Sequence, residues 1–156
     1  MAIDESTKII LDAIGVVRNE LKEPKRGPDV QKIVTEIELD ASLSDALDYL
    51  DEFSHIMLLY WARKGESQEL KTLRIRPHND PEAPMAGIFA TFTPDRPNPV
   101  GVSIARIVER NGNILKVSGL GIVDGTSVID IKPYIPRAFS IPDAKVASWI
   151  NRQRRP

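Results

Sequence analysis

The segment Arg96-Pro97-Asn98-Pro99-Val100-Gly101-Val102-Ser103 combines a guanidinium and an amide with residues that restrict the backbone. Its prolines fix φ and bias each preceding residue towards extended geometry, so the segment should be stiff. A stiff loop that carries Arg96 and Asn98 can bind a ligand with little loss of conformational entropy. The alternative is a rigid turn with no role beyond its shape.

Two aspartates lie near a second apolar stretch. Asp130 stands between Ile129 and Ile131, and a carboxylate on a largely apolar strand needs a partner or a function. Asp124 precedes Gly125, which is a common arrangement in turns. Asp130 is therefore the stronger candidate for a functional role, and Asp124 is the weaker one.

The composition excludes several other chemistries. The 156 residues contain no cysteine, which rules out disulfides, thiolate metal ligands and a cysteine nucleophile. The only histidines are His55, expected in the core, and His78, so no metal site is expected. Gly119-Leu120-Gly121 looks superficially like a dinucleotide-binding loop, but a strand rather than a helix is expected after it.

The charge distribution limits the possible partners. A formal net charge of −1 excludes a globally basic nucleic-acid-binding surface but leaves room for local patches. Two clusters of cations could supply such a patch or could simply be solvated: Arg63, Lys64, Lys71, Arg74 and Arg76, and then Arg152, Arg154 and Arg155. No apolar run approaches the roughly 20 residues that cross a bilayer, and the acidic N-terminus does not resemble a signal peptide. A cytoplasmic protein is expected.

Strands must position most of these residues. Alternation, β-branched residues and flanking turn residues predict six to eight strands, drawn from segments 9–18, 33–39, 54–62, 70–76, 87–91, 104–109, 114–118, 120–123 and 128–131. The uninterrupted apolar run 54–62 predicts a central strand buried on both faces, with a helix as the alternative. Asn111-Gly112 predicts a hairpin, and residues 124–127 predict a second one.

Helices should be few and short. Leu43, Ala46, Leu47 and Leu50 have helical spacing, with Ser42 as the expected N-cap. A last short helix should carry Val146, Trp149 and Ile150. Closely spaced strands with little helix between them predict a mainly β protein whose antiparallel sheet forms a barrel or a sandwich.

Six segments together resemble one family. They are Ile14-Gly15-Val16-Val17-Arg18, Phe53-Ser54-His55-Ile56, Gly87-Ile88-Phe89-Ala90-Thr91, the Arg96–Ser103 segment, Val123-Asp124-Gly125-Thr126 and Asp130-Ile131-Lys132-Pro133-Tyr134. In order and spacing they resemble the TrmO family, also called TsaA-like, over about residues 9–143. RPNPVG and DIKPY in one chain form a specific signature.

The resemblance implies a fold, a reaction and partners. Members of this family use S-adenosylmethionine to methylate N6 of threonylcarbamoyladenosine beside the anticodon of tRNA. Their fold is a small antiparallel β-barrel, and they typically form homodimers with the cofactor near the subunit interface. The chain resembles the short form, so residues 1–143 are expected to be the barrel methyltransferase domain and residues 144–156 a short helix with a basic tail.

The resemblance also implies site residues. The cofactor-binding positions would be Pro24, Lys25, Arg26, Arg63, Lys64, Arg96, Val102, Gly119, Leu120 and Gly121. Arg26 or Arg63 is expected to pair with the methionyl carboxylate. The family usually has an arginine where this chain has Phe92, which is expected to stack on adenine instead, and Asp95 stands at an often aromatic position. From the chemistry that this reaction needs, the candidate catalytic residues are Asp130, Lys132, Tyr134 and Asn98.

The acceptor nitrogen explains the need for a base. N6 is conjugated to a carbonyl and is a poor nucleophile until its proton leaves, so Asp130 or Asp124 would accept that proton. Two alternatives remain open at the level of sequence. One is the same chemistry on a small-molecule acceptor, and the other is a non-catalytic RNA-binding barrel that uses Arg74, Arg76 and the tail arginines.

Overall fold

The structure is a computed structural model that describes residues 8–62, 70 and 72–151. The chain divides into two compact units. We call Met1–Trp61 with Val102–Tyr134 the barrel unit, and Ala62–Gly101 with Ile135–Pro156 the loop-rich unit. Every helix in the described part of the chain is too short or too polar to span a membrane.

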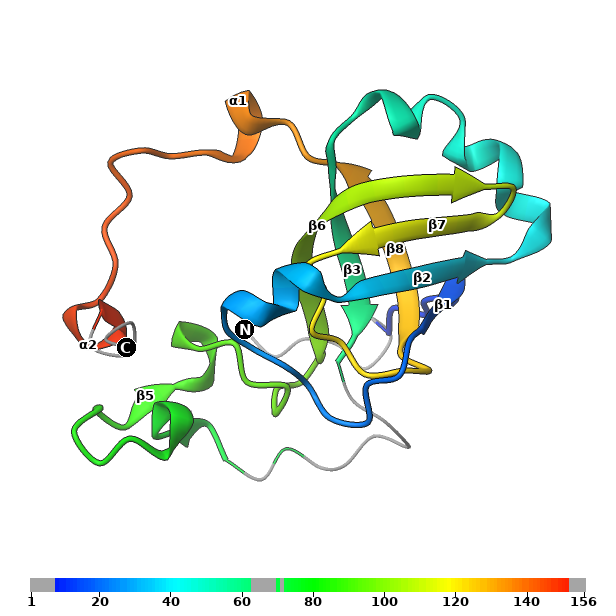
Figure 1. Ribbon diagram of the computed structural model, residues 1–156. Helices are drawn as coiled ribbons and strands as arrows, with labels where there is room; N and C mark the ends of the chain where they lie inside the picture. Colours follow the sequence, from blue (N-terminus) through cyan, green and yellow to red (C-terminus); the bar gives the residue numbers. More distant parts are fainter. Residues whose placement is uncertain (1–7, 63–69, 71, 152–156) are drawn as a thin grey trace. The chain divides into compact units, whose positions relative to one another are not determined.

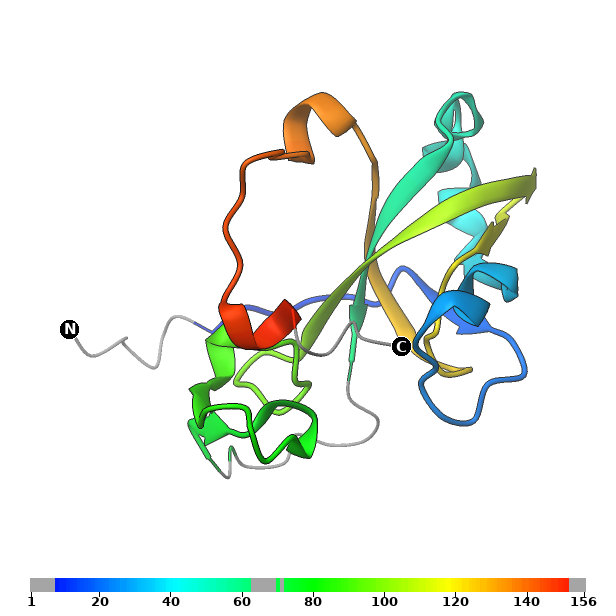
Figure 2. The ribbon, with the colours of Figure 1, turned by 60° about the vertical axis from the view of Figure 1, so that its left-hand side comes forward.

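Six antiparallel strands among the described residues close the barrel (Figure 1). They are β1 Gly15–Arg18, β2 Val34–Leu39, β3 His55–Trp61, β6 Val100–Asn111, β7 Ile114–Ser118 and β8 Ser127–Pro133. Their order is β1-β2-β7-β6-β3-β8, and β8 closes the barrel on β1 through Gly15↔Val128 and Val16↔Ser127. Figure 2 shows the long strand β6 running along the barrel wall between β3 and β7. The mainly β fold class and the barrel are confirmed.

Alternating side chains fill the barrel interior. Val17, Ile37, Ile56, Leu58, Leu115, Val117 and Val128 are fully buried. On β3 only Ile56 and Leu58 are buried, whereas Met57 and Leu59 beside them are half-buried. The prediction that this strand is buried on both faces is therefore wrong. In a small barrel, one face of each strand points inward and the other points outward.

Several predicted elements are shorter than expected. The first strand begins at Gly15 rather than at Ile9, and residues 120–123 form no strand. Among the described residues of the expected strand 70–76, only β4 Arg74–Ile75 is extended in a sheet, and it pairs with β5 Ala86–Gly87 as a separate two-stranded ribbon. The rest of the 87–91 run turns into the 3-10 helix η5 Ile88–Ala90. In contrast, the predicted β6–β7 hairpin forms, although its two-residue turn is Gly112-Asn113, with Gly112 at φ 59, because Asn111 still pairs with Ile114.

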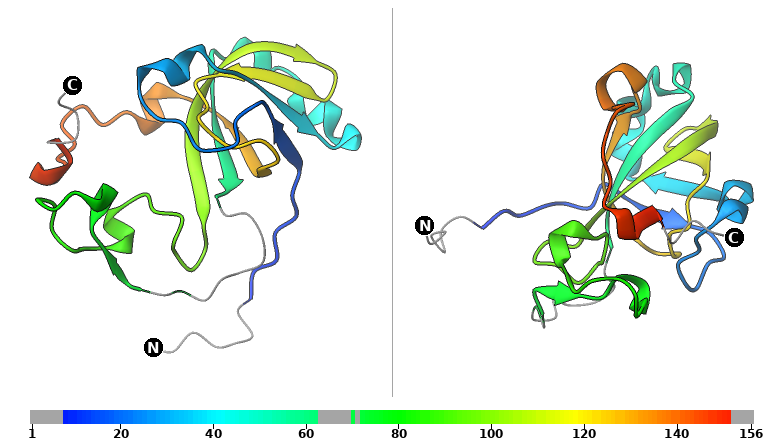
Figure 3. Two further views of the ribbon diagram at one scale, coloured as in Figure 1. Left: turned by 60° about the horizontal axis from the view of Figure 1, so that its bottom comes forward. Right: turned by 90° about the vertical axis from the view of Figure 1, so that its left-hand side faces the viewer.

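The helical segments are mostly 3-10 turns. They are η1 Pro28–Lys32, η2 Ala41–Leu47, η3 Leu50–Glu52 and η4 Pro77–Asn79, together with α1 Pro136–Phe139 and α2 Ser148–Asn151. Figure 3 shows η2 and η3, in cyan, beside the β6–β7 hairpin at one end of the barrel. Arg110 of β6 attaches them there, because it donates to the Asp48 carboxylate at 2.9 Å and to the Ser44 carbonyl at 3.0 Å.

The N-cap of η2 is Asp40, not Ser42 as predicted. Its carboxylate accepts hydrogen bonds from the Ser42 Oγ at 2.5 Å and the Ser42 backbone N–H at 2.9 Å. These two bonds, with the side-chain bond contributing more, lower the pKa of Asp40 below its ordinary value. Aspartate and serine are about equally good N-caps, so the cap is decided by where the helical backbone begins, which is at Ala41.

A pH-dependent effect of this cap follows. Because folding lowers the pKa of Asp40, its stabilising contribution is complete above the unfolded pKa and disappears as pH falls through the folded value. We expect Asp40→Ala to lower the urea midpoint at neutral pH. The difference from the unmodified protein should shrink on acidification below about pH 5. A difference that stays constant down to about pH 2 would contradict this assignment.

Candidate functional site

The first loop of the barrel unit packs on the segment between β7 and β8. The Lys25 backbone N–H donates to the Gly121 carbonyl at 2.9 Å. A Cβ atom on Gly121 would overlap the Lys25 carbonyl oxygen and lie 2.8 Å from its carbonyl carbon. Residues 24–26 and 119–121, which the barrel unit contributes to the predicted cofactor site, therefore lie against each other.

Segment 119–121 is itself fixed by the barrel. The Gly119 N–H donates to the Ile33 carbonyl at 3.3 Å, and the Leu120 side chain is fully buried in the core. By contrast, Pro24, Lys25 and Arg26 are exposed. Lys25 and Arg26 are thus exposed cations on a loop that packs against segment 119–121, and that segment is anchored in the core through Leu120.

Asn19 holds the start of the first loop. Its amide donates to the Thr35 hydroxyl at 3.2 Å and to the Ile122 carbonyl at 2.9 Å, and its oxygen accepts from the Leu21 N–H at 2.9 Å. The Asn19 N–H donates to the Asp124 carboxylate at 3.1 Å. Asp124 therefore anchors this loop, which supports the turn role over the role of base. Residues 120–123 form no strand because the backbone carbonyls of Gly121 and Ile122 accept hydrogen bonds from the first loop and from the Asn19 side chain.

Replacing Asn19 by alanine should destabilise the barrel. The change removes three hydrogen bonds and takes a partner from the hydroxyl of the fully buried Thr35. We expect the free energy of unfolding to fall by about 1–3 kcal/mol. Denaturant titration measures this, with Asn111→Ala at an exposed position as the control. Equal stability of the two variants would contradict the anchoring role.

Asp130 and Lys132 form an ion pair on the outside of the barrel. Lys132 Nζ lies 2.7 Å from Asp130 Oδ2, and Asp130 Oδ1 accepts from the Ile131 N–H at 2.9 Å. The side chains of Asp130 and Lys132 are 40% and 55% exposed. The register of β8 against β3 shifts between Leu59 and Tyr60, so Asp130 follows a β-bulge. Such bulges often re-aim side chains next to functional sites.

Tyr134 lies at the end of β8 beside His55. The Tyr134 N–H donates to the His55 carbonyl at 2.9 Å, and the two rings meet edge to face with centroids 6.5 Å apart. His55 Nδ1 lies 2.8 Å from the Ser54 hydroxyl. The histidine expected in the core is thus half-buried and adjacent to a predicted catalytic residue. Sequence reasoning missed this contact, because it depends on the pairing of β3 with β8.

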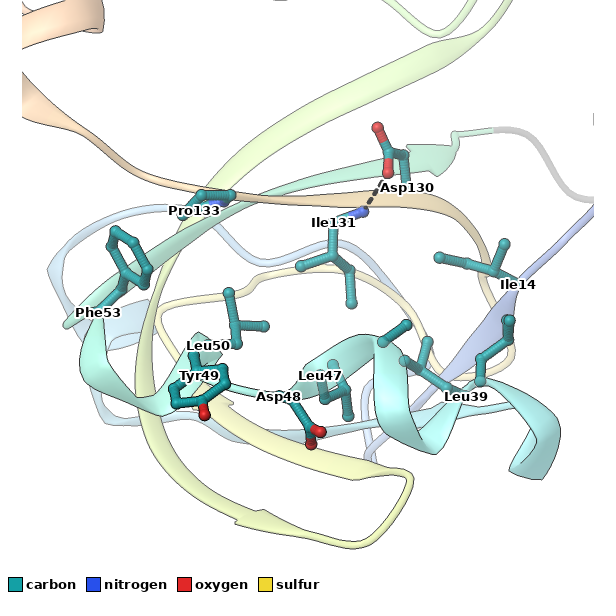
Figure 4. A pocket seen from close by; sticks show the side chains of 12 residues that line it. Ile14, Leu39, Leu47, Asp48, Tyr49, Leu50, Phe53, Asp130, Ile131 and Pro133 are labelled. Atoms are coloured by element: carbon teal, nitrogen blue, oxygen red, sulfur yellow. Dashed lines mark hydrogen bonds between the residues drawn. The ribbon is translucent and has the colours of Figure 1, made fainter.

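An apolar pocket lies between β8 and the segment that carries η2 and η3 (Figure 4). Its volume is about 330 Å³, and its lining is Ile14, Leu39, Leu43, Ala46, Leu47, Asp48, Tyr49, Leu50, Phe53, Asp130, Ile131 and Pro133. Figure 4 shows the Asp130 carboxylate and the Ile131 side chain on opposite sides of β8. The carboxylate therefore lies on the face of β8 opposite to Ile131.

Short backbone hydrogen bonds shape the Arg96–Ser103 segment. The Arg96 N–H donates to the Pro94 carbonyl at 3.0 Å, and the Val100 N–H donates to the Asn98 carbonyl at 2.8 Å, which gives two tight turns. The carbonyl of the buried Pro99 accepts from the Ala62 N–H at 2.7 Å. Asn98 is exposed.

The predicted site residues belong to different parts of the chain. Phe92, Arg96 and Asn98 belong to the loop-rich unit, whereas Val102 begins the second part of the barrel unit. Arg63 and Lys64 lie outside the described residues, as do Lys71 and the tail arginines. The roles of all these residues stay predictions.

The chain matches a known protein family that has both this barrel and these motifs. Residues 16–139 match the model of the tRNA-methyltransferase O N-terminal domain. The chain belongs to the TrmO family. This match confirms the family that the RPNPVG and DIKPY segments indicated.

Relatives of known name agree with this family. The chain is 37% identical over 143 residues to a probable S-adenosyl-L-methionine-binding protein of Pyrococcus abyssi, covering 89% of this chain and 74% of that protein. It is 37% identical over 147 residues to the tRNA (adenine(37)-N6)-methyltransferase of Escherichia coli, covering 87% and 62%. A crystal structure of TrmO from Pseudomonas aeruginosa superposes with a TM-score of 0.72 at 27% identity, covering 91% and 63%.

The chain matches only part of the length of some of these relatives. The chain spans somewhat less than two thirds of the E. coli enzyme and of the P. aeruginosa structure. Relatives are named S-adenosylmethionine-binding proteins and S-adenosylmethionine-dependent methyltransferases. The chain is thus a member of a methyltransferase family that uses this cofactor, and the predicted cofactor and enzyme class are confirmed at that level.

The residues present fit S-adenosylmethionine by their chemistry. The cofactor carries a carboxylate, which the exposed cations Lys25 and Arg26 can pair with. Close packing at Gly121 fixes the segment that carries these cations, so little order has to be gained on binding. Lys25 and Arg26 can thus supply a counter-charge for the carboxylate of S-adenosylmethionine from a segment that is already held in place.

Proposed function

We propose that this chain methylates N6 of adenosine 37 in tRNA, with threonylcarbamoyladenosine as the acceptor and S-adenosylmethionine as the donor. The observation that carries the proposal is the Asp130–Lys132 pair on an outer barrel strand, next to Tyr134, in a chain that belongs to the TrmO family. The name of the E. coli relative supports adenosine 37 of tRNA as the acceptor. The short resemblance of residues 130–134 to the family signature supports the same reaction.

The cofactor supplies an already activated methyl group, so the protein has to orient and protect the reactants. We assign binding of the carboxylate to Lys25 and Arg26, together with Arg63 and Lys64. We assign the adenosyl part to the backbone of residues 119–121 and to Val102. Arg96 and Asn98 would hold the RPNPVG turn against the reactants.

Asp130 is the proposed base. The bound cofactor would supply the methyl group to N6, and the Asp130 carboxylate would accept the proton that N6 loses. Lys132, at 2.7 Å, holds that carboxylate in place, and Tyr134 orients the acceptor. The half-exposed position of Asp130 leaves the carboxylate accessible to a large substrate.

We also propose that the protein is a cytoplasmic homodimer with a barrel methyltransferase domain at residues 1–143 and a basic tail at 144–156. The outward face of β6 supports dimerisation, because Val102, Ile104 and Val108 expose apolar side chains there. Light scattering at increasing protein concentration measures the molar mass. A mass that stays at one chain would contradict the dimer.

The reaction is tested with labelled S-adenosylmethionine and total tRNA from a strain that lacks its own enzyme. Nucleoside analysis should show label in methylated threonylcarbamoyladenosine. Label in a small molecule but not in tRNA would identify a different acceptor and overturn the proposal. Salt-dependent RNA binding that is indifferent to the cofactor would indicate a non-catalytic RNA-binding barrel instead.

A further inference from the structure

Two phenylalanine rings in the described part of the loop-rich unit are almost fully exposed. Phe89, within η5, is 77% exposed, and Phe92, just after it, is 89% exposed. Burying such a ring is normally worth about 1.5–3 kcal/mol, so leaving two of them in water is costly for the free chain. Two exposed rings within four residues indicate a surface that contacts another molecule.

One guanidinium group lies against these rings, and a second arginine lies on the neighbouring strand. The Arg96 guanidinium lies over the Phe89 ring, 5.8 Å from its centroid, and its Nη1 donates to the Thr91 carbonyl at 3.4 Å. Arg74 is exposed and pairs with Gly87, two residues before Phe89, in the β4–β5 ribbon. The Ile88 N–H donates to the Leu73 carbonyl at 3.1 Å, which fixes η5 against this ribbon.

This combination matches single-stranded nucleic acid. Unpaired bases stack on aromatic rings and on guanidinium planes, while arginines also neutralise the phosphates between the bases. We propose that Phe89 and Phe92, with Arg96 over one ring and Arg74 on the adjacent strand β4, form a stacking surface for unpaired bases of an RNA loop. The inference rests on the proposed function, because the anticodon loop of tRNA is such a substrate.

Two other occupants fit the surface less well. The adenine of a single cofactor needs one ring, whereas two exposed rings can stack successive bases. A second copy of this chain would bury the rings against apolar groups, but here a cation lies over one ring. The cationic flank favours a polyanionic partner.

Binding of a fluorescent anticodon stem-loop RNA tests the inference. A blunt duplex with the same stem but no loop serves as the reference RNA. The variants are Phe89→Ala, Phe92→Ala, Phe92→Leu and Phe92→Trp. Tyr49→Ala is the matched control, because Tyr49 is a 74% exposed aromatic residue of the barrel unit. S-adenosylmethionine affinity and molar mass are measured for each variant.

We expect each alanine variant to weaken stem-loop binding about 5- to 100-fold while duplex binding changes little. Phe92→Leu should behave like alanine, and Phe92→Trp and Tyr49→Ala should bind like the unmodified protein. Unchanged stem-loop affinity in both alanine variants overturns the inference. If the variants lose affinity for S-adenosylmethionine but keep their affinity for RNA, Phe92 belongs to the cofactor site. If they lose the dimer, the rings contact a second copy of the chain. Either result overturns the inference. If the unmodified protein binds RNA through these rings but does not bind S-adenosylmethionine, the proposed function fails and the stacking surface stands.

Discussion

Gly121→Ala should abolish the arrangement that the cofactor site depends on. The new Cβ would overlap the Lys25 carbonyl oxygen, which is a backbone atom and cannot rotate away as a side chain would. The first loop would have to leave segment 119–121 and lose the 2.9 Å hydrogen bond from Lys25 to Gly121. We expect a loss of about 1–3 kcal/mol in the free energy of unfolding. Affinity for S-adenosylmethionine should fall about tenfold or more, since displacing the loop need cost only about 1.4 kcal/mol of binding energy.

The control is another glycine-to-alanine change. Gly87 has φ −61, and a Cβ atom there would meet nothing within 4 Å. Gly87→Ala should therefore leave both stability and cofactor affinity close to their original values. Calorimetric titration gives the affinities, and denaturant titration gives the stabilities. If Gly121→Ala is destabilised but binds the cofactor normally, the packing of residues 24–26 on 119–121 is structural only.

Asp130→Asn should lose most of the methyl-transfer rate. Asparagine keeps the size of the side chain but cannot accept the N6 proton, and it cannot form the ion pair with Lys132. A positioned base contributes typically about 10²- to 10⁴-fold, so we expect kcat to fall within that range. Because the carboxylate is 40% exposed, stability should change little.

Glu36→Gln is the matched control for this charge change. Glu36 is also a half-exposed carboxylate on an outer barrel face, 3.7 Å from Lys116 Nζ. Its removal should leave kcat unchanged. Single-turnover methylation of tRNA measures the rate, and titration confirms that cofactor affinity is retained in both variants. A rate for Asp130→Asn within a few-fold of the unmodified protein would remove Asp130 from the catalytic set and leave only its ion pair.

Features set by neighbouring residues could be predicted from the sequence. The alternation of residues 33–39 predicts strand β2, and Asn111-Gly112 predicts the β6–β7 hairpin. The prolines around Asn98 predict a stiff turn. The partner of Asp130 was also within reach of the sequence, because residues two apart on a strand share one face, which places Lys132 beside it.

Features that depend on distant residues were decided by the tertiary structure. Residues 120–123, expected to form a strand, instead make hydrogen bonds with Asn19 and the first loop. The α-helix expected near residue 43 is a 3-10 helix capped by Asp40. Only the tertiary structure places residues 24–26 on 119–121, and only the pairing of β3 with β8 places His55 beside Tyr134. Local propensity acts over a few residues, whereas these contacts depend on which strands pair and which backbone groups then lack a partner. The sequence by itself thus determined the motifs and the fold class of this TrmO-family chain, and the closed barrel decided which of those motifs meet.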